Sequence, residues 1–322
     1  MLSRGTFVVF GRLGKMARHI IYIINPVSGT RKKTGLKRLI EEQTRREKIA
    51  YKIFPSVESG DYSFLRSMIK EEKITDVVVA GGDGTLSQVV GSLMNEDINF
   101  GVIPCGSGNG LALAAGIFTE PAKALDIIFH SKAKAIDGFY VNQSFSCMLT
   151  GIGFDAQVAH EFARGAKRGL RKYAVLVSKN FFRAKPYHFT IESNGLKFST
   201  EAFFISIANS NQFGNNFTIA PKALLSDGLL DVVIVQKTAK PLLLFNLIKQ
   251  ILRGKLQKVP SGKTETERAT SLKVPVIYFQ TQQLMIENYS LAPMHIDGDP
   301  AETPEKLKIR ILPKCFRLIQ PG

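Results

Sequence analysis

The sequence predicts a two-part α/β chain, with an amino-terminal half built on a parallel sheet and a carboxyl-terminal half that is antiparallel and β-rich. The length of 322 residues is comfortable for two domains. Up to about Lys134, strand-like and helical segments alternate, which is typical of a parallel sheet covered by helices on both faces. Beyond Lys134 most strand-like runs are joined by turns, which favours antiparallel pairing.

The amino-terminal half shows four strand patterns, each followed by a helical pattern. The first strand pattern, at 19–24, is a continuous apolar run that Asn25 and Pro26 end. Asp61 is placed to cap a helix that runs to about Glu72. The other expected elements are strands at 51–54, 74–80 and 100–103 and helices at 34–48, 86–94 and 111–115.

The carboxyl-terminal half reads as short strands with two helical insertions, near 156–183 and 240–253. A polar stretch at 260–271 is expected to be a loop. The strand-like runs are 139–141, 144–149, 188–192, 202–208, 231–235, 274–279, 284–287 and 306–312.

These patterns divide the chain into four parts. Met1–Lys15 is short, Gly-rich and basic, and it lacks the long apolar centre of a signal peptide. We therefore expect a disordered extension at 1–17, an α/β domain at 18–135, a β-rich domain at 136–303 and a tail at 304–322.

The charge balance indicates an anionic partner. Lys and Arg number 43 against 27 Asp and Glu, a formal charge of +16, which suits nucleotide phosphates, nucleic acid or an anionic membrane. No apolar run is long enough to span a bilayer. Three widely spaced cysteines, Cys105, Cys147 and Cys315, form no disulfide or zinc pattern, and they favour a reducing compartment.

Three glycine-containing loops each follow a predicted parallel strand. They are Asn25-Pro-Val-Ser-Gly-Thr30, Gly81-Gly-Asp-Gly-Thr85 and Gly106-Ser-Gly-Asn-Gly110. Such loops all emerge at the carboxyl edge of the sheet, where ligands bind in open α/β folds. Glycine lets the backbone approach a phosphate closely, and the following helix offers free N–H groups. One such loop would indicate only a tight turn, but three on one edge predict a phosphate-binding site.

The ordered set of loops resembles the diacylglycerol kinase catalytic-domain family, which includes sphingosine kinases and bacterial lipid kinases. Gly81-Gly-Asp-Gly-Thr85 alone is shared with NAD kinases and phosphofructokinases. The further motifs of the resemblance are Gly153-Phe-Asp-Ala156, Ala220-Pro221, Ser226-Asp-Gly-Leu-Leu-Asp231 and Asp297-Gly-Asp299. The resemblance implies a nucleotide-binding α/β domain of the NAD kinase and phosphofructokinase type and a β-rich lipid-binding domain. It also implies ATP in the cleft between them and a tail that returns to the first domain.

The same resemblance assigns two catalytic carboxylates. Asp83 lies in the second glycine loop, and its plain alternative is to cap the helix that begins at Leu86. Asp299 matches the position that the family usually fills with Glu as proton acceptor, and it is one methylene shorter. Which of the two takes the proton is left open. Without the family, Asp297-Gly-Asp299 indicates only a turn between strands, and the pattern His295-x-Asp297-x-Asp299 indicates alternation along a strand.

The remaining expected site residues fall into three groups. Asp155 matches the position that meets the lipid head group in sphingosine kinases, with a helix N-cap as its alternative. Asp227, with the carbonyls of Leu224 and Leu229, matches a structural Mg²⁺ site, with a plain turn as its alternative. The resemblance also implies that ATP contacts Asn25, Pro26, Ser28, Gly29, Ser56, Gly81, Gly82, Gly84, Thr85, Ser107 and Asn109.

Basic segments in the second half suit an anionic membrane surface. Residues 164–172 and 179–185 are rich in Lys and Arg, and 240–258 forms a basic amphipathic helical pattern. The alternative is a solvated helix that packs its apolar face on the core. We therefore expect a cytoplasmic protein peripherally associated with the membrane, with a homodimer left open. No nucleic-acid-binding module is visible.

The sequence thus predicts an ATP- and Mg²⁺-dependent lipid kinase that phosphorylates a lipid hydroxyl, on diacylglycerol or a sphingoid base. Two alternatives stay open: an NAD kinase-like enzyme and a non-catalytic nucleotide-binding protein. The third loop tilts the expectation modestly toward a sphingoid base, because Gly110 follows Asn109 where bacterial diacylglycerol kinases usually have Asp. In that case Asp155 would supply the anion for an amino-alcohol.

Overall fold

The computed structural model describes residues 18–28, 34–164, 180, 183–214, 217–218, 220–237 and 276–322. Several predictions made above lie outside the described residues. They are the extension at 1–17, the role of Gly29, most of the basic stretch at 164–185, the basic helix at 240–258 and the loop at 260–271.

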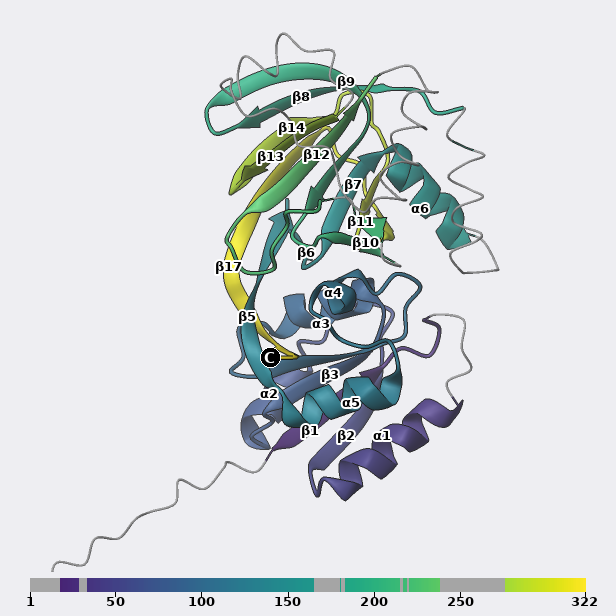
Figure 1. Cartoon of the computed structure of the whole chain (residues 1–322), viewed down its shortest axis with the longest axis vertical. Helices are drawn as coiled ribbons and strands as arrows, with labels where there is room; N and C mark the ends of the chain where they lie inside the picture. Colours follow the sequence, from purple (N-terminus) through teal and green to yellow (C-terminus); the bar gives the residue numbers. More distant parts are fainter. Residues whose placement is uncertain are drawn as a thin grey trace, which may run out of the picture.

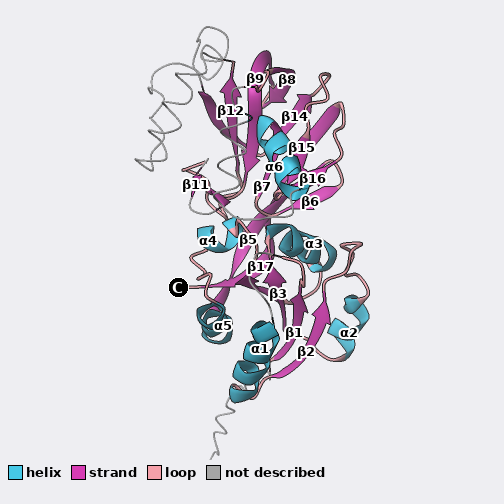
Figure 2. Ribbon diagram, turned by 90° about the vertical axis from the view of Figure 1, so that its right-hand side faces the viewer, coloured by secondary structure: helices cyan, strands magenta, loops and turns pink. Residues whose placement is uncertain are grey.

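A parallel sheet covered by helices on both faces forms the lower half of the molecule in Figure 1, as predicted. Its strand order is β2-β1-β3-β4, and every neighbouring pair is parallel. Helices α1 and α5 lie on one face of this sheet, and α2 and α3 lie on the other (Figures 1 and 2). The elements are β1 (His19–Ile24), α1 (Thr34–Arg46), β2 (Ala50–Pro55), α2 (Leu65–Glu71), β3 (Asp76–Gly81), α3 (Asp83–Leu93), β4 (Asn99–Pro104), α4 (Gly110–Ala114) and α5 (Pro121–His130).

The central strands are apolar without alternation because helices bury both of their faces. Residues 20–23 of β1 and 77–80 of β3 are all fully buried. One predicted helix start is wrong. Asp61 does not cap α2, which begins at Leu65. Its carboxylate instead accepts the N–H and hydroxyl of Ser63 in the turn before the helix.

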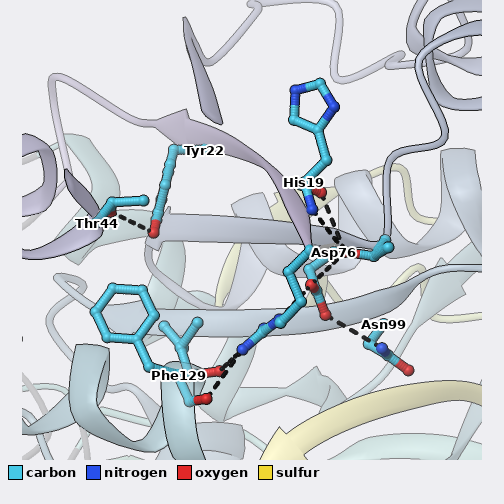
Figure 3. Close-up of polar contacts among 9 residues, drawn as sticks. His19, Tyr22, Thr44, Asp76, Asn99 and Phe129 are labelled. Carbon is cyan, nitrogen blue, oxygen red and sulfur yellow. Dashed lines mark hydrogen bonds and ion pairs between the residues drawn. The ribbon is translucent and has the colours of Figure 1, made fainter. Parts of the chain in front are cut away.

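A polar network closes the amino edge of the sheet (Figure 3). Asp76, at the start of β3 and 1% exposed, accepts hydrogen bonds from Arg18 Nε at 2.9 Å, Thr75 Oγ1 at 2.7 Å and Asn99 Nδ2 at 3.1 Å. The same Arg18 guanidinium donates to the carbonyls of Ile128 and Phe129 at the end of α5. This edge therefore pairs its buried carboxylate with a cation.

The second half is β-rich and antiparallel, as predicted, and it has its own apolar core. Helix α6 (Phe154–Arg164) packs against β15 and β16. Its strands are β5 (Lys132–Val141), β6 (Ser144–Ser146), β7 (Leu149–Gly153), β8 (Tyr187–Ser193), β9 (Leu196–Ala208), β10 (Gln212–Gly214), β11 (Phe217–Thr218), β12 (Leu230–Gln236), β13 (Val276–Thr281), β14 (Gln283–Glu287), β15 (Met294–Ile296) and β16 (Asp299–Ala301).

Two long strands join the halves. Strand β17 (Lys306–Gln320) runs antiparallel to β5 through both halves (Figure 1). Near its end, Leu318 pairs in parallel with Phe100 of β4. The strand expected at 306–312 therefore continues to Gln320, and it extends the parallel sheet.

The single strand expected at 144–149 is two strands, β6 and β7. Cys147 and Met148 leave the ladder because side chains take their backbone N–H groups. Cys147 donates to Ser87 Oγ at 3.2 Å, and Met148 donates to Asp297 Oδ1 at 3.2 Å. This break lets α3 and the turn at Asp297 contact the start of β7.

Candidate active site

The three glycine loops meet at the carboxyl edge of the parallel sheet. Asn25, directly after β1, donates from Nδ2 to Thr85 Oγ1 in the second loop at 2.7 Å. Its Oδ1 accepts the N–H of Val27 at 3.0 Å, and its carbonyl accepts from Ser28 Oγ at 3.4 Å. Pro26 is exposed, whereas Ser28 and Thr85 are buried. Asn25 therefore joins the first loop to the second.

The second and third loops touch backbone to backbone. A Cβ on Gly106 would lie 2.6 Å from Gly82 Cα, and a Cβ on Gly82 would lie 3.2 Å from Gly106 Cα. Both distances are inside the separation of about 3.5–4.0 Å at which carbon atoms pack. Gly82 and Gly106 thus allow an approach that no other residue would allow.

Asn109 holds the third loop closed. Its backbone is left-handed, with φ 54°, a conformation that Asn tolerates better than most residues. Its Oδ1 accepts the N–H of Gly106 at 2.8 Å, and its Nδ2 donates to the carbonyl of Gly106 at 3.0 Å. Ser107 is half-buried within this loop. Ser56, half-buried after β2, donates its N–H to the carbonyl of Ile24 at 2.9 Å, which places it beside the first loop.

Asp83 begins α3 and ties the second loop to the third. Its Oδ2 accepts the N–H of Gly110 at 2.9 Å, and its Oδ1 accepts the N–H of Leu111 at 3.1 Å, both at the start of α4. The predicted alternative, a cap for its own helix at Leu86, is wrong because α3 already begins at Asp83 and the side chain caps α4.

A second carboxylate reaches Asp83 from the β-rich half. Asp299, exposed at the start of β16, lies against Gly84, and a Cβ on Gly84 would sit 2.0 Å from Asp299 Oδ2. Burial raises the pKa of Asp83, and the nearby Asp299 carboxylate raises it further, although the two N–H groups of α4 lower it. Two catalytic candidates more than 200 residues apart in the sequence therefore share one site.

Asp297 is buried and accepts hydrogen bonds from both halves of the molecule. Its Oδ1 accepts from Ser146 Oγ at 2.8 Å and from the N–H of Leu149 at 3.0 Å. Its Oδ2 accepts from Ser87 Oγ on α3. Burial raises the pKa of Asp297 to about 6, although several of these hydrogen bonds lower it.

The simple alternation expected over 295–299 is wrong. Strand β15 ends at Ile296, and Asp297 and Gly298, with φ 50° and 87°, form a turn before β16. The turn that the Asp297-Gly-Asp299 pattern indicates by itself is correct. This turn buries Asp297 and leaves Asp299 exposed beside Gly84.

Asp155 lies in the first turn of α6 and is 6% exposed. Its Oδ1 accepts the N–H of Ala156 at 2.8 Å. Its Oδ2 faces Gly151 on β7 and lies 3.5 Å from His295 Nε2. The helix begins one residue earlier, at Phe154, so Asp155 is inside the helix and not its N-cap.

The residues expected to hold Mg²⁺ lie together in the turn before β12. Asp227 is exposed, and its Oδ1 accepts the N–H of Leu229 at 3.0 Å. Partial loss of water around the carboxylate, and the neighbouring Asp137 carboxylate, raise the pKa of Asp227. Carboxylate and carbonyl oxygens are the ligand types that Mg²⁺ takes, but both oxygens of Asp137 already accept backbone N–H groups, from Gly228 and Lys314. Within the described ranges, no three His, Cys, Asp or Glu side chains cluster as metal ligands.

Two family models match most of the chain. Residues 19–141 match the diacylglycerol kinase catalytic domain, and residues 149–320 match the YegS C-terminal NAD kinase beta sandwich-like domain. A Xanthomonas campestris pv. campestris protein named "Probable lipid kinase YegS-like" is 33% identical over 280 residues, covering 82% of this chain and 84% of the relative. The chain belongs to the YegS-like lipid kinases of the diacylglycerol kinase family.

Further relatives of this lipid kinase agree. A Shewanella frigidimarina protein of the same printed name is 26% identical over 273 residues, covering 83% of each chain. A solved diacylglycerol kinase structure from Bacillus anthracis aligns with a TM-score of 0.66 at 18% identity, covering 95% of this chain and 97% of that one. A second structure from that organism gives a TM-score of 0.75 at 20% identity, covering 95% and 97%. The structural likeness shows the shared fold.

Three residues of the candidate site have roles in the structure that the sequence patterns did not predict. Ser87 and Asp297 join α3 to the turn of the second half, and His295 faces Asp155. The pattern His-x-Asp-x-Asp was visible, but its strand interpretation hid the turn. No helix in the described part of the chain is long and apolar enough to cross a bilayer.

Proposed function

We propose that this lipid kinase transfers the γ-phosphate of ATP, with Mg²⁺, to the hydroxyl of a membrane lipid, either diacylglycerol or a sphingoid base. The observation that carries the proposal is the meeting of Asp83 and Asp299 across Gly84. Phosphoryl transfer depends mainly on positioning and charge stabilisation, with a carboxylate beside the attacking hydroxyl. At the carboxyl edge, the glycine loops would position the phosphates, because their backbones approach closely. The two carboxylates, one from each half of the molecule, would lie beside the attacking hydroxyl.

Asp299 is the better-placed proton acceptor of the two. It is exposed, whereas both oxygens of Asp83 accept N–H groups of α4. We propose that Asp299 takes the proton of the lipid hydroxyl. Asp83 orients the third loop through α4 and keeps negative charge beside Asp299, which favours proton uptake there.

The backbone of the three loops would bind the phosphates. The first turn of α3 has N–H groups with no partner within the helix, and its dipole favours an anion. Gly82 and Gly106 keep side chains out of this edge. When bound with ATP, Mg²⁺ would screen the phosphate charges. At the turn before β12, Asp227 and the carbonyls of Leu224 and Leu229 would hold a structural ion.

Turnover of ATP tests this proposal against the two alternatives. Vesicles containing diacylglycerol or sphinganine should stimulate ATP turnover by the wild-type protein, and Asp299→Asn should abolish the stimulation. Turnover that needs NAD and ignores vesicles would favour an NAD kinase-like enzyme. An absence of turnover with every acceptor would favour a nucleotide-binding protein.

We also propose that the kinase binds anionic membrane surfaces peripherally. The support is the formal charge of +16 and the basic segments at 164–185 and 240–258. Co-sedimentation with anionic vesicles should fall as salt rises, since salt screens Lys and Arg from the lipid. Binding that is absent at low salt, or unchanged at high salt, would contradict this role.

A further inference from the structure

A buried histidine lies between the turn that carries Asp299 and the carboxylate of Asp155. His295 is 1% exposed and sits opposite Gly151 in the pairing of β15 with β7. A Cβ on Gly151 would come 2.5 Å from His295 Nε2 and 2.0 Å from Asp155 Oδ2. Gly151 therefore leaves the space in which the imidazole and the carboxylate face each other.

The contacts of the ring fix its tautomer. His295 Nδ1 accepts the N–H of Gly298 at 3.2 Å. An accepting Nδ1 carries no proton, so the neutral ring carries its proton on Nε2. Nε2 lies 3.5 Å from Asp155 Oδ2, which is a charge contact longer than an ordinary hydrogen bond. One ring therefore touches the catalytic turn with one nitrogen and Asp155 with the other.

Asp155 has few other groups to satisfy its charge. Its Oδ2 is buried, and among the described residues none donates a hydrogen bond to it. A buried carboxylate needs a donor or a cation nearby, because loss of water is costly. The Nε2 atom of His295, 3.5 Å from Oδ2, is the charged or polar group that the structure brings to this oxygen.

We infer that His295 is a positioning residue with two separable contacts, and this inference rests on the proposed lipid kinase function. Through Nδ1 it holds Gly298, and so it fixes the turn that places Asp299 over Gly84. Through Nε2 it holds the Asp155 carboxylate turned inward, so that Asp155 is a structural anion and not a receptor for a cationic head group.

The second contact affects substrate choice. An amino-alcohol would gain from an ammonium–carboxylate pair only if Asp155 were released from His295. An uncharged lipid alcohol needs no such release. The inference therefore opposes the sphingoid preference that the third loop suggested, and it makes His295 the residue that disfavours a cationic lipid.

Two substitutions separate the contacts. In His295→Asn, the side-chain oxygen can occupy the place of Nδ1 and keep Gly298, but nothing reaches Asp155. In His295→Gln, the longer side chain can place an N–H where Nε2 was, but it leaves Gly298 without its acceptor. Melting temperatures show whether each variant folds. The measurement is kcat and KM on diacylglycerol and on sphinganine in matched micelles.

His295→Asn should change the preference between the two lipids, whereas His295→Gln should change kcat on both. His295→Asn should raise the kcat/KM ratio of sphinganine to diacylglycerol by about tenfold, and adding Asp155→Asn should remove that shift. His295→Gln should lower kcat on both lipids by about tenfold and leave the ratio unchanged. Equal effects of Asn and Gln, no effect of either, or a ratio shift that survives Asp155→Asn would each overturn the inference.

A second measurement needs neither a variant nor turnover. In protein with ¹⁵N-labelled histidine, the resonances of His295 should show an unprotonated Nδ1 and a protonated Nε2 at neutral pH. The opposite tautomer would overturn the inference. If the wild-type protein phosphorylates no lipid, the proposed function fails, and the tautomer still decides the contacts of His295.

Discussion

The two ends of strand β3 use carboxylates in opposite ways. At its start, Asp76 is buried and paired with Arg18 (Figure 3). Just past its end, Asp83 lies beside Asp299, and the described residues pair neither Asp83 nor Asp297 with a Lys or Arg. A paired carboxylate stabilises the fold, whereas clustered carboxylates raise each other's pKa. On this difference we base the proposal that the amino edge stabilises the sheet and that the carboxyl edge carries out phosphoryl transfer.

Neutralising the exposed carboxylate of the carboxyl edge, Asp299, should have the largest effect on activity. Asp299→Asn should lower kcat by about a thousandfold with little change in melting temperature, because it removes a proton acceptor and almost no volume. Steady-state kinetics with a lipid acceptor checks this. Glu302→Gln, which removes a nearby exposed charge, is the matched control. Similar kcat values for the two variants would show that Asp299 is not the base.

Substitution of the buried carboxylate at the amino edge should instead lower the free energy of unfolding. Asp76→Ala should destabilise the fold by about 3 kcal/mol, since it leaves Arg18 and Asn99 without their buried acceptor. Urea unfolding measures this. The control Asp97→Ala removes an exposed carboxylate that pairs with Arg317, and it should cost less than about 1 kcal/mol. If folded Asp76→Ala lost as much kcat as Asp299→Asn, the amino edge would also affect catalysis. That result would contradict the proposed difference between the two edges.

Asp297 should show a cost that depends on pH. Its pKa of about 6 is raised above the ordinary value of 3.8, so the folded state binds the proton more tightly than the unfolded state. Stability from this group is therefore present at low pH and is lost as pH rises from about 4 to about 6. Asp297→Asn should gain relative to wild type, on the order of 2 kcal/mol, between pH 4 and pH 7. Unfolding curves at both pH values test this, and a pH-independent difference would contradict it.

The glycine contact should show the smallest effect. Gly106→Ala pushes the second and third loops apart, so the KM for ATP should rise by about tenfold. Gly35→Ala is the control, because a Cβ on Gly35 meets nothing within 4 Å. If Gly106→Ala and Gly35→Ala had the same KM for ATP, the contact between the second and third loops would not contribute to nucleotide binding.

Local patterns predicted most elements because their signals are short-range. The apolar run at 19–24 is β1, and the three glycine loops do meet at one edge. Helix α5 went unrecognised, although Pro121 at its first turn is a usual start signal. The length of β17 was underestimated because Pro313 interrupts its pattern, and the strand passes this point with a register shift.

The sequence predicted which residues to assign to the candidate site, but not which of them contact one another. That Asp83 caps α4, that Asp297 joins Ser87 to β7, and that His295 faces Asp155 all depend on contacts between distant segments. No periodicity encodes such contacts. A turn at Asp297 decides which carboxylate is buried and which is exposed, and the strand interpretation of that segment could not have shown it.

Transfer of radiolabel from γ-³²P-ATP to lipid is the most direct test of the proposal that the carboxyl edge transfers phosphate to a lipid. Wild-type protein, Asp299→Asn and Asp76→Asn would be incubated with ATP, Mg²⁺ and a panel of lipid extracts, and the lipids would be separated. We predict a labelled lipid with wild type and with folded Asp76→Asn, and none with Asp299→Asn. Labelling that is absent with wild type, or equal with Asp299→Asn, would contradict the assignment of the carboxyl edge to phosphoryl transfer.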